Sequence, residues 1–209
     1  MFKKFFLKPI TIENCRSVAD IHLRAFPDSA LTRLGKEAVN RYYQWQLTGP
    51  HDCMAMGAYT EAGQMKGFVF GGTFHGSLSG FVSKNRWYLI GQVLLRPWMI
   101  ANPIFYEKIV LGVRTLMPRN KKNGIKNSSQ SPPKSFGILA IAVDPDDQGS
   151  GVGKALMQNA ESEAKQRHFT QMGLTVHPSN MQAVRFYERL NWKRIVMDGI
   201  WSGKMVKDL

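Results

Sequence analysis

The chain has few cysteines, no long apolar run and few acidic residues. Its two cysteines, Cys15 and Cys53, are too few for a disulfide framework, and neither lies in a CxxC pair or beside clustered histidines, as a metal site would need. We therefore expect no metal site and a reducing, cytoplasmic location. The uncharged stretches 87–95 and 97–106 are separated by Arg96, and each is much shorter than the roughly 20 apolar residues that span a bilayer. The N-terminal apolar runs are also too short for a signal peptide, so the sequence predicts neither a transmembrane helix nor an export signal.

Because acidic residues are scarce, the chain is basic, and its charge is concentrated in one segment. Between Lys84 and Lys134 ten residues are cationic and only Glu107 is acidic, which leaves an excess of nine positive charges out of a net charge of +13. A basic amphipathic segment with aromatic residues is compatible with peripheral contact to an anionic membrane. A solvated basic face over a buried apolar stripe is the alternative. We do not expect nucleic-acid binding, because no helix-turn-helix, zinc-finger or RNP pattern accompanies the charge.

The order of predicted elements indicates a mixed α+β or α/β domain. The patterns predict a strand at 9–12, helices at about 14–27 and 31–47, strands at 53–59 and 65–74, amphipathic helices within 84–118, a loop at 119–133, a strand at 136–143, a helix at about 151–168, a strand at 172–176, a helix at 181–190, and strands at 194–197 and 204–206. The apolar run 136–143 is expected to be the central strand. An antiparallel start followed by alternating strands and helices predicts a mixed sheet. We expect a single domain over 1–209, with a basic helical and loop insertion at about 76–133.

The most specific feature is a glycine-rich turn between the central strand and the next helix. Free N–H groups and the positive end of the helix dipole make such a turn suited to a phosphate or pyrophosphate. A P-loop is excluded, because three residues rather than four separate Gly149 from Gly153, and Ala155 lacks the magnesium-binding hydroxyl. A dinucleotide fingerprint is also excluded, because the glycines are spaced G-x-G-x-G and lie late in the chain.

A third type of phosphate-binding turn agrees with the sequence at every position that its motif defines. The turn resembles the acyl-CoA signature of the GNAT superfamily of N-acetyltransferases, Gln/Arg-x-x-Gly-x-Gly/Ala, with Gln148, Gly151 and Gly153 at the defined positions. The stretch from Asn180 to Tyr187 is similar to the second block of this family, Asn followed by Ala-x-x-Phe-Tyr-x-x-x-Gly-Phe. Asn-Trp at 191–192 takes the place of the final Gly-Phe. The two blocks together cover about residues 136–195.

The resemblance implies both a fold and an activity. The family fold is α+β in three layers, with a mixed, mostly antiparallel central sheet, a V-shaped splay between two parallel strands, and helices on both faces. The implied enzyme is an acyl-CoA-dependent N-acyltransferase. It would move an acetyl group, the family default, from acetyl-CoA to a primary amine by direct attack in a ternary complex. The alternatives are a non-catalytic acyl-CoA-binding module, or a membrane- or nucleic-acid-binding protein that uses the basic 84–134 segment.

The resemblance also implies where coenzyme A binds. The pantetheine arm would pair with the central strand as an added strand does, and backbone N–H groups of the turn would hold the pyrophosphate, with charge added by Lys154. Asn180 is similar to a family residue near the thiol. The cofactor-binding residues implied in this way are Ile141, Ala142, Val143, Gln148, Gly149, Ser150, Gly151, Val152, Gly153, Lys154, Asn180, Ala183, Phe186 and Tyr187.

The resemblance assigns catalysis to Tyr187, which would give a proton to the departing thiolate. Ordinary aromatic packing on a helix is the alternative for this residue. Many relatives carry a glutamate base on the central strand, but 137–143 has no ionisable side chain, so the base is absent, replaced by water or supplied elsewhere. His177 is the candidate on the substrate side, since histidine as a residue type exchanges protons near neutral pH. A turn histidine that hydrogen-bonds the backbone is the alternative.

The acceptor is the part of the reaction that the resemblance specifies least. Acceptor specificity in this superfamily lies in the N-terminal helices and in insertions. The stretch 26–43, followed by a basic helical insert, resembles superfamily members of cell-surface polysaccharide pathways. This indicates an amino sugar or another small metabolite as the amine-bearing acceptor, and leaves the oligomeric state open.

Overall fold

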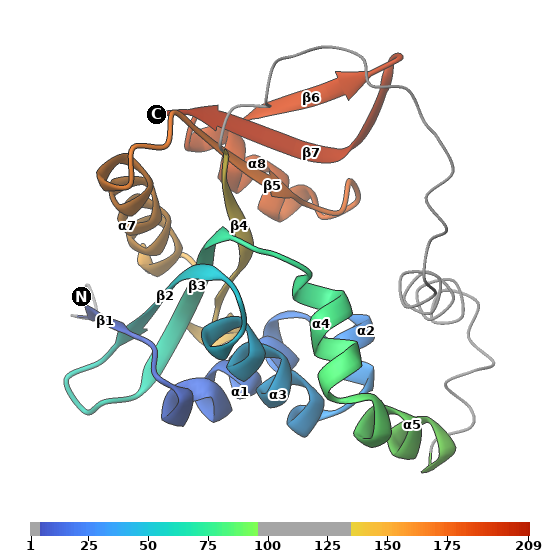
Figure 1. Ribbon diagram of the computed structural model, residues 1–209. Helices are drawn as coiled ribbons and strands as arrows, with labels where there is room; N and C mark the ends of the chain where they lie inside the picture. Colours follow the sequence, from blue (N-terminus) through green and yellow to red (C-terminus); the bar gives the residue numbers. More distant parts are fainter. Residues whose placement is uncertain (1–4, 96–134) are drawn as a thin grey trace. The chain divides into compact units, whose positions relative to one another are not determined.

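The structure of the protein is a computed structural model that describes residues 5–95 and 135–209 (Figure 1). These residues form two compact units. The first contains 5–10, 52–74 and 135–209, and the second contains 11–51 and 75–95. The predicted loop at 119–133, and the part of the predicted helical insertion after residue 95, lie outside the described residues.

The first unit is built on a seven-stranded sheet with the order β1-β2-β3-β4-β5-β7-β6. Its strands are β1 (Phe6–Pro9), β2 (Asp52–Tyr59), β3 (Met65–Thr73), β4 (Ser135–Val143), β5 (Gln171–Thr175), β6 (Lys193–Met197) and β7 (Ile200–Asp208). All neighbouring pairs are antiparallel except β4 and β5, which are parallel. The predicted mixed, mostly antiparallel α+β fold is thus confirmed. The first strand lies earlier than predicted, because residues 12–14 form the 3-10 helix η1 (Ile12–Asn14).

The core of the first unit lies between the sheet and helix α7 (Val152–Gln166), which packs against β2, β3 and β4. The helix buries Val152, Leu156, Ala160 and Ala164, which recur every four residues and so form one stripe. Helix α8 (Met181–Arg189) contributes Val184 to the same core. Met157 is buried beside Leu156, so the buried positions are three and four residues apart, which suits a helix and not the strict alternation of a strand.

The central strand β4 contains an extra residue that sequence periodicity does not reveal. Its register with β3 pairs Phe70 with Ala140 and Gly71 with Ile138, so Leu139 is a bulged residue. Before the bulge Ile138 belongs to the core, and after it Ile141 packs against the same core. The bulge therefore changes which alternate residues of β4 face α7.

The second unit is helical. It contains η1, α1 (Cys15–Ala25), α2 (Ala30–Arg33), α3 (Lys36–Thr48), α4 (Ser77–Lys84) and α5 (Arg86–Leu95). The single helix predicted at 31–47 is in fact two, because Gly35 adopts a φ of +94° and ends the first of them. Helices α1 and α3 pack together, and both contribute to a buried polar cluster. In this cluster His22 lies 2.9 Å from the Tyr43 hydroxyl and 3.2 Å from Ser29 Oγ.

We expect the buried His22 to make stability fall in mild acid. Burial lowers the pKa of His22 from 6.5 to about 4, so this imidazole is neutral in the folded protein at neutral pH. The unfolded chain binds a proton near pH 6.5 and the folded chain does not, so the contribution of His22 is complete above that pH and is lost as the pH falls towards about 4. The total loss should be on the order of 3 kcal/mol, since one pKa unit corresponds to about 1.4 kcal/mol.

Urea unfolding between these pH values, followed for wild type and His22→Gln, measures this effect. The free energy of unfolding of the variant should change less with pH than that of wild type. Parallel pH curves for the two proteins would show that His22 does not carry the dependence.

Within 5–95 and 135–209, no helix is long and apolar enough to cross a membrane. In the same residues, no group of three or more His, Cys, Asp or Glu side chains is arranged to hold a metal ion.

Candidate active site

The glycine-rich turn has a backbone conformation that requires glycine at two positions. The turn leaves β4 through Asp144, whose carboxylate accepts a 3.0 Å hydrogen bond from the Asp146 N–H at the start of η3 (Pro145–Asp147). Gly149 and Gly151 then have φ values of +79° and +88°. A residue with a Cβ pays roughly 1–2 kcal/mol for this left-handed region, whereas a Cβ at either position would meet nothing within 4 Å. The requirement is therefore conformational, and the surface around the turn is open.

The first turn of α7 presents its N–H groups beside these glycines. The Gly151 carbonyl accepts the bond from Ala155 N–H at 3.0 Å, which is the first bond of the helix. The N–H groups of Val152, Gly153 and Lys154 precede this bond and have no partner within the helix. Gly153 differs from Gly151, because its φ is not positive and a Cβ there would lie 3.4 Å from Val143 Cγ2, an ordinary contact distance. The backbone conformation therefore requires glycine at 151 but not at 153.

A buried ion pair holds the turn to strand β3. Lys66 Nζ lies 2.8 Å from Asp147 Oδ2, and the two side chains are 14% and 3% exposed. The Asp144 N–H also donates to the Lys66 carbonyl at 2.8 Å. Sequence reasoning missed Lys66, because it is remote from the turn along the chain and belongs to no motif.

We expect Lys66→Ala to destabilise the first unit by on the order of 3 kcal/mol, because removing one partner leaves the Asp147 carboxylate buried without its cation. Chemical denaturation measures the change. Lys193→Ala is the matched control, since Lys193 forms an ion pair with Asp208 in which the side chains are 74% and 67% exposed, and such pairs contribute about 0–1 kcal/mol. Equal losses in the two variants would contradict the role given to burial.

The fold brings the start of α8 against the turn. Gln182 Nε2 donates to Gln148 Oε1 at 2.9 Å, which joins the two segments directly. Phe186 lies beside Gly153, where a Cβ would come within 3.5 Å of its ring. Asn180 is the N-cap of α8, and its Oδ1 accepts a 3.1 Å bond from the Ala183 N–H. The two blocks that the sequence suggested are therefore adjacent in the structure.

Tyr187 is buried in the aromatic packing of α8. Its side chain is 8% exposed, and its ring centre lies 5.3 Å from that of Phe186 and 6.0 Å from that of Trp192. Burial raises the pKa of Tyr187 to about 12, so its hydroxyl is protonated at neutral pH.

Strands β4 and β5 separate soon after they begin. Their parallel pairing ends at Gly137 and Gly173, although β4 continues to Val143. In the described residues, the edge of β4 that faces β5 consequently has no partner strand from 138 to 143. An edge of this kind can pair with an extended amide-bearing molecule. The predicted splay between the two parallel strands is confirmed.

His177 lies in the turn between β5 and α8 and is exposed. Its Nδ1 is 2.7 Å from Ser179 Oγ and accepts a 3.3 Å bond from the Ser179 N–H. His177 thus hydrogen-bonds the backbone of its own turn, as the alternative to a substrate-side role expects. A place for His177 on the substrate side stays a prediction.

The other predicted site residues are placed by the same elements. Those of the central strand are on β4, those of the turn lie between η3 and α7, and Lys154 is exposed in the first turn of α7. Ala183 is half-buried and packs against the core of the first unit. Every residue of the predicted set therefore belongs to the first unit.

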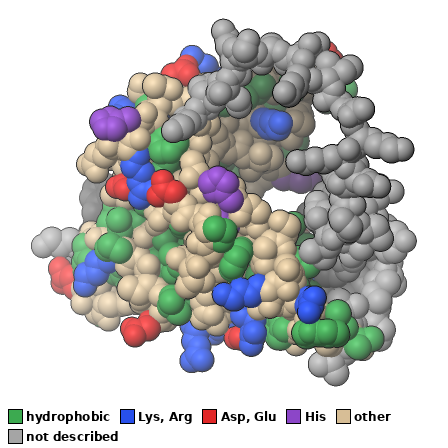
Figure 2. All heavy atoms as spheres, in the orientation of Figure 1, with side chains coloured by type: hydrophobic (Ala, Val, Ile, Leu, Met, Phe, Trp, Pro, Cys, Tyr) green, Lys and Arg blue, Asp and Glu red, His purple; other side chains and the backbone are tan. Residues whose placement is uncertain are grey.

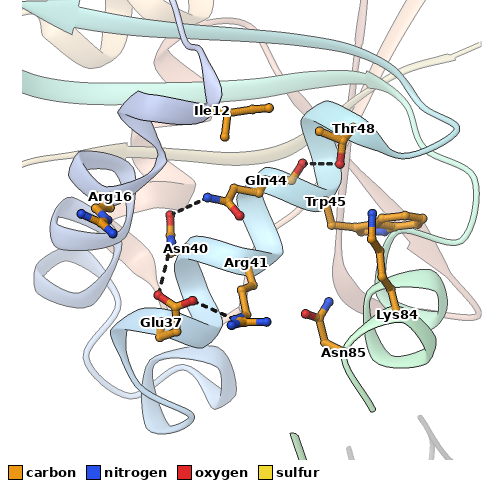
Figure 3. Close-up of a pocket in the computed structure, with 10 residues that line it drawn as sticks. All are labelled: Ile12, Arg16, Glu37, Asn40, Arg41, Gln44, Trp45, Thr48, Lys84 and Asn85. Atoms are coloured by element: carbon orange, nitrogen blue, oxygen red, sulfur yellow. Dashed lines mark hydrogen bonds and ion pairs between the residues drawn. The ribbon is translucent and has the colours of Figure 1, made fainter. Parts of the chain in front are cut away.

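A hollow that the sequence did not suggest lies in the second unit (Figure 3). It has a volume of about 420 Å³, and it is lined by Ile12, Arg16, Glu37, Asn40, Arg41, Gln44, Trp45, Thr48, Lys84 and Asn85. Its one carboxylate, Glu37, accepts a 2.8 Å bond from Arg41 Nε. Lys84 Nζ lies over the Trp45 ring, 5.3 Å from its centre. The hollow thus has three cations and one acid, which no motif could reveal because helices from distant parts of the chain supply them.

Comparison with known proteins gives short sequence matches and a whole-chain structural match. Mycothiol acetyltransferase of Streptosporangium roseum is 36% identical over 61 residues, which are 29% of this chain and 18% of that protein. The ribosomal protein bS18 alanine N-acetyltransferase of Escherichia coli is 40% identical over 55 residues, 26% of this chain and 37% of that protein. The aligned parts span less than two fifths of either relative.

The structural likeness extends over nearly the whole chain. The PaiA N-acetyltransferase of Thermoplasma acidophilum, a crystal structure in complex with coenzyme A, has a TM-score of 0.59 and 12% identity and covers 99% of each chain. The alanine N-acetyltransferase of Escherichia coli has a TM-score of 0.54 and 17% identity, and covers 98% of this chain and 94% of its own. At these identities the likeness shows the fold.

The family is shown by a match that covers more than four fifths of the chain. The sequence model of the Acetyltransferase (GNAT) family matches residues 16–192, a range that contains the glycine turn, α8 and Tyr187. This family uses acetyl-CoA. The chain therefore belongs to the Acetyltransferase (GNAT) family.

Proposed function

We propose that the protein is an N-acetyltransferase that moves the acetyl group of acetyl-CoA to a primary amine by direct attack in a ternary complex. The observation that carries the proposal is the left-handed turn at Gly149 and Gly151, which opens the start of α7 beside an unpaired edge of β4. A helix start bared by glycine suits a pyrophosphate, and the strand edge suits the amides of a pantetheine arm. The coenzyme A complex of the Thermoplasma acidophilum relative supports this choice of ligand.

The residue roles that we propose combine the family resemblance with the positions of these residues in the first unit. N–H groups from Gln148 to Lys154 would hold the pyrophosphate, and the edge of β4 at 141–143 would hold the arm. Phe186 and Ala183 of α8 would border the turn. Asn180, already the cap of α8, would lie near the thiol.

Acetyl-CoA supplies a thioester, whose carbonyl carbon the amine nitrogen attacks and whose C–S bond breaks to release a thiolate. We assign Tyr187 the role of giving its hydroxyl proton to that sulfur, since this hydroxyl is protonated at neutral pH. The nitrogen loses its proton to solvent, since 137–143 of β4 has no ionisable side chain to accept it, and the Tyr187 oxygen regains a proton from solvent.

The acceptor we propose is an amino sugar or another small amine-bearing metabolite. The acceptors named for the relatives, mycothiol and a ribosomal-protein alanine, belong to proteins that match this chain over short segments only. We further propose that 1–209 works as one acyltransferase domain in which the insertion at about 76–133 serves the acceptor side.

Two measurements test the proposal. Acetyl-CoA at about 100 times its Kd should stabilise the folded protein by about 2.7 kcal/mol and so raise its Tm by several degrees. A panel of amines, including amino sugars and a peptide with a free N-terminal alanine, should then include an acceptor that releases free coenzyme A thiol. Absence of any Tm rise at saturating acetyl-CoA would sink the proposal. A Tm rise without thiol release from any amine would favour the non-catalytic acyl-CoA-binding module.

A further inference from the structure

Helix α5 of the second unit exposes large apolar side chains on one face. Trp87 is 74% exposed, Ile90 48% and Leu94 75%. Their spacing of three and four residues places them on one side of the helix. Tyr88, Leu89 and Gln92, which lie on the rest of α5, are half-buried. The helix therefore has a half-buried inner face and an exposed outer face that carries large apolar side chains.

These side chains are concentrated in a small part of the molecule. Of the nine large apolar side chains that are exposed in the described residues, four lie between 77 and 95, where Leu78 of α4 is 55% exposed. In the space-filling view hydrophobic side chains gather over α5 (Figure 2). Single exposed apolar residues need no explanation, but a gathered patch marks a binding surface.

The charge around the patch is of one sign. Residues 77–95 include Lys84 and Arg86 and no acidic residue, and the Arg86 guanidinium lies over the Trp87 ring, 5.3 Å from its centre. The neighbouring hollow adds Arg16, while its Arg41 is paired with the carboxylate of Glu37. A partner for this surface must therefore be apolar where α5 meets it and anionic around that area.

The face is fixed to the rest of the second unit. The Arg41 guanidinium of α3 lies over the Tyr88 ring, 4.5 Å from its centre, on the half-buried part of α5. Tyr42 of α3 packs edge-on against Phe81 of α4, with ring centres 5.4 Å apart. Contacts on the inner side hold α4 and α5 without covering Trp87, Ile90 and Leu94.

We propose that the second unit docks on an anionic membrane surface, with the outer face of α5 in the headgroup region and Lys84 and Arg86 facing the lipid phosphates. An apolar face with tryptophan and flanking cations has the composition of an interfacial helix. An anionic leaflet also complements the positive charge of the surface, whereas a neutral protein surface does not. The proposal does not depend on the proposed acetyl transfer.

The test is co-sedimentation of the full chain with phosphatidylcholine vesicles, with and without phosphatidylglycerol. Wild type should bind the vesicles that contain phosphatidylglycerol and bind neutral vesicles weakly, and added salt should reduce the difference. Trp87→Ala combined with Leu94→Gln should lower the partition coefficient at least about tenfold, because two large apolar groups no longer enter the interface. Lys84→Gln combined with Arg86→Gln should lower it about 30-fold on the anionic vesicles only, since each of the two charges contributes about 1 kcal/mol.

A matched control separates the surface from apolar exposure in general. Met197→Gln combined with Ile200→Gln removes two apolar side chains that are 63% and 73% exposed on the β6–β7 hairpin of the first unit, and it should bind vesicles as wild type does. All of these positions are exposed, so unchanged Tm values verify folding.

Three outcomes overturn the proposal. The first is equal binding of wild type to neutral and anionic vesicles. The second is binding of the Trp87→Ala and Leu94→Gln double variant to anionic vesicles as strong as that of wild type. The third is self-association of wild type that this double variant abolishes, with no binding of wild type to vesicles. The last outcome would make a second copy of the chain the occupant of the face.

Discussion

Tyr187→Phe is expected to lower kcat for acetyl transfer by about 10²- to 10⁴-fold, the range in which a positioned general acid contributes. The substitution removes one hydroxyl and keeps the ring that packs against Phe186 and Trp192. The pKa of about 12 means that wild type has the proton in place across the neutral range. Without it the thiolate must leave unprotonated or take a proton from water.

Thiol release with the best amine of the panel measures this loss. The Kd for acetyl-CoA should stay within about threefold of wild type, because an interaction made only in the transition state affects kcat and not ground-state binding. Tyr59→Phe is the control, since Tyr59 of β2 is 8% exposed, as Tyr187 is, and lies outside the predicted site. An unchanged kcat in Tyr187→Phe would reduce this residue to aromatic packing.

Gly151→Asp should remove most of the rise in Tm that acetyl-CoA causes, with an affinity loss on the order of 100-fold. A carboxylate at this position would lie at the start of α7, and two like charges about 4 Å apart repel by up to roughly 4 kcal/mol near a protein surface. Aspartate tolerates a left-handed φ better than most residues, and a negative charge at a helix start is favourable to the helix. The variant should therefore fold and bind acetyl-CoA weakly.

Gly153→Ala is the matched variant for this experiment. Its Cβ would make ordinary contacts with Val143 and Phe186, and alanine is favoured over glycine within a helix by about 1 kcal/mol. We expect a Tm at or above that of wild type and a rise with acetyl-CoA that is retained. Isothermal titration with acetyl-CoA measures both variants. Retained binding by Gly151→Asp, or equal loss in both, would contradict a pyrophosphate site at this turn.

Much of the first unit could be predicted because its information is local. The apolar run of β4, the glycine spacing of the turn and the four-residue stripe of α7 each lie within a short window. The same holds for α8, where Asn180 caps the helix. Errors occurred where a single residue changes the geometry, as Gly35 does by dividing one predicted helix into two.

The site was only partly predictable because its supporting contacts are long-range. Nothing in a linear pattern connects Lys66 with Asp147, or shows that the pair is buried. The bulge at Leu139 depends on the register with β3, and the end of β4–β5 pairing at Gly137 depends on two strands. The roles of Tyr187, His177 and the cofactor-binding residues stay predictions for the experiments above.

The sequence by itself determined the family and the position of the turn, because motif spacing and helix and strand periods are properties of short stretches of chain. It also determined the excess of positive charge. Only the tertiary structure decided which of these residues meet. It buried Tyr187 and so raised its pKa, it joined Gln148 to Gln182, and it left Trp87 and Leu94 exposed. Burial and adjacency depend on how distant elements pack, which no local pattern encodes.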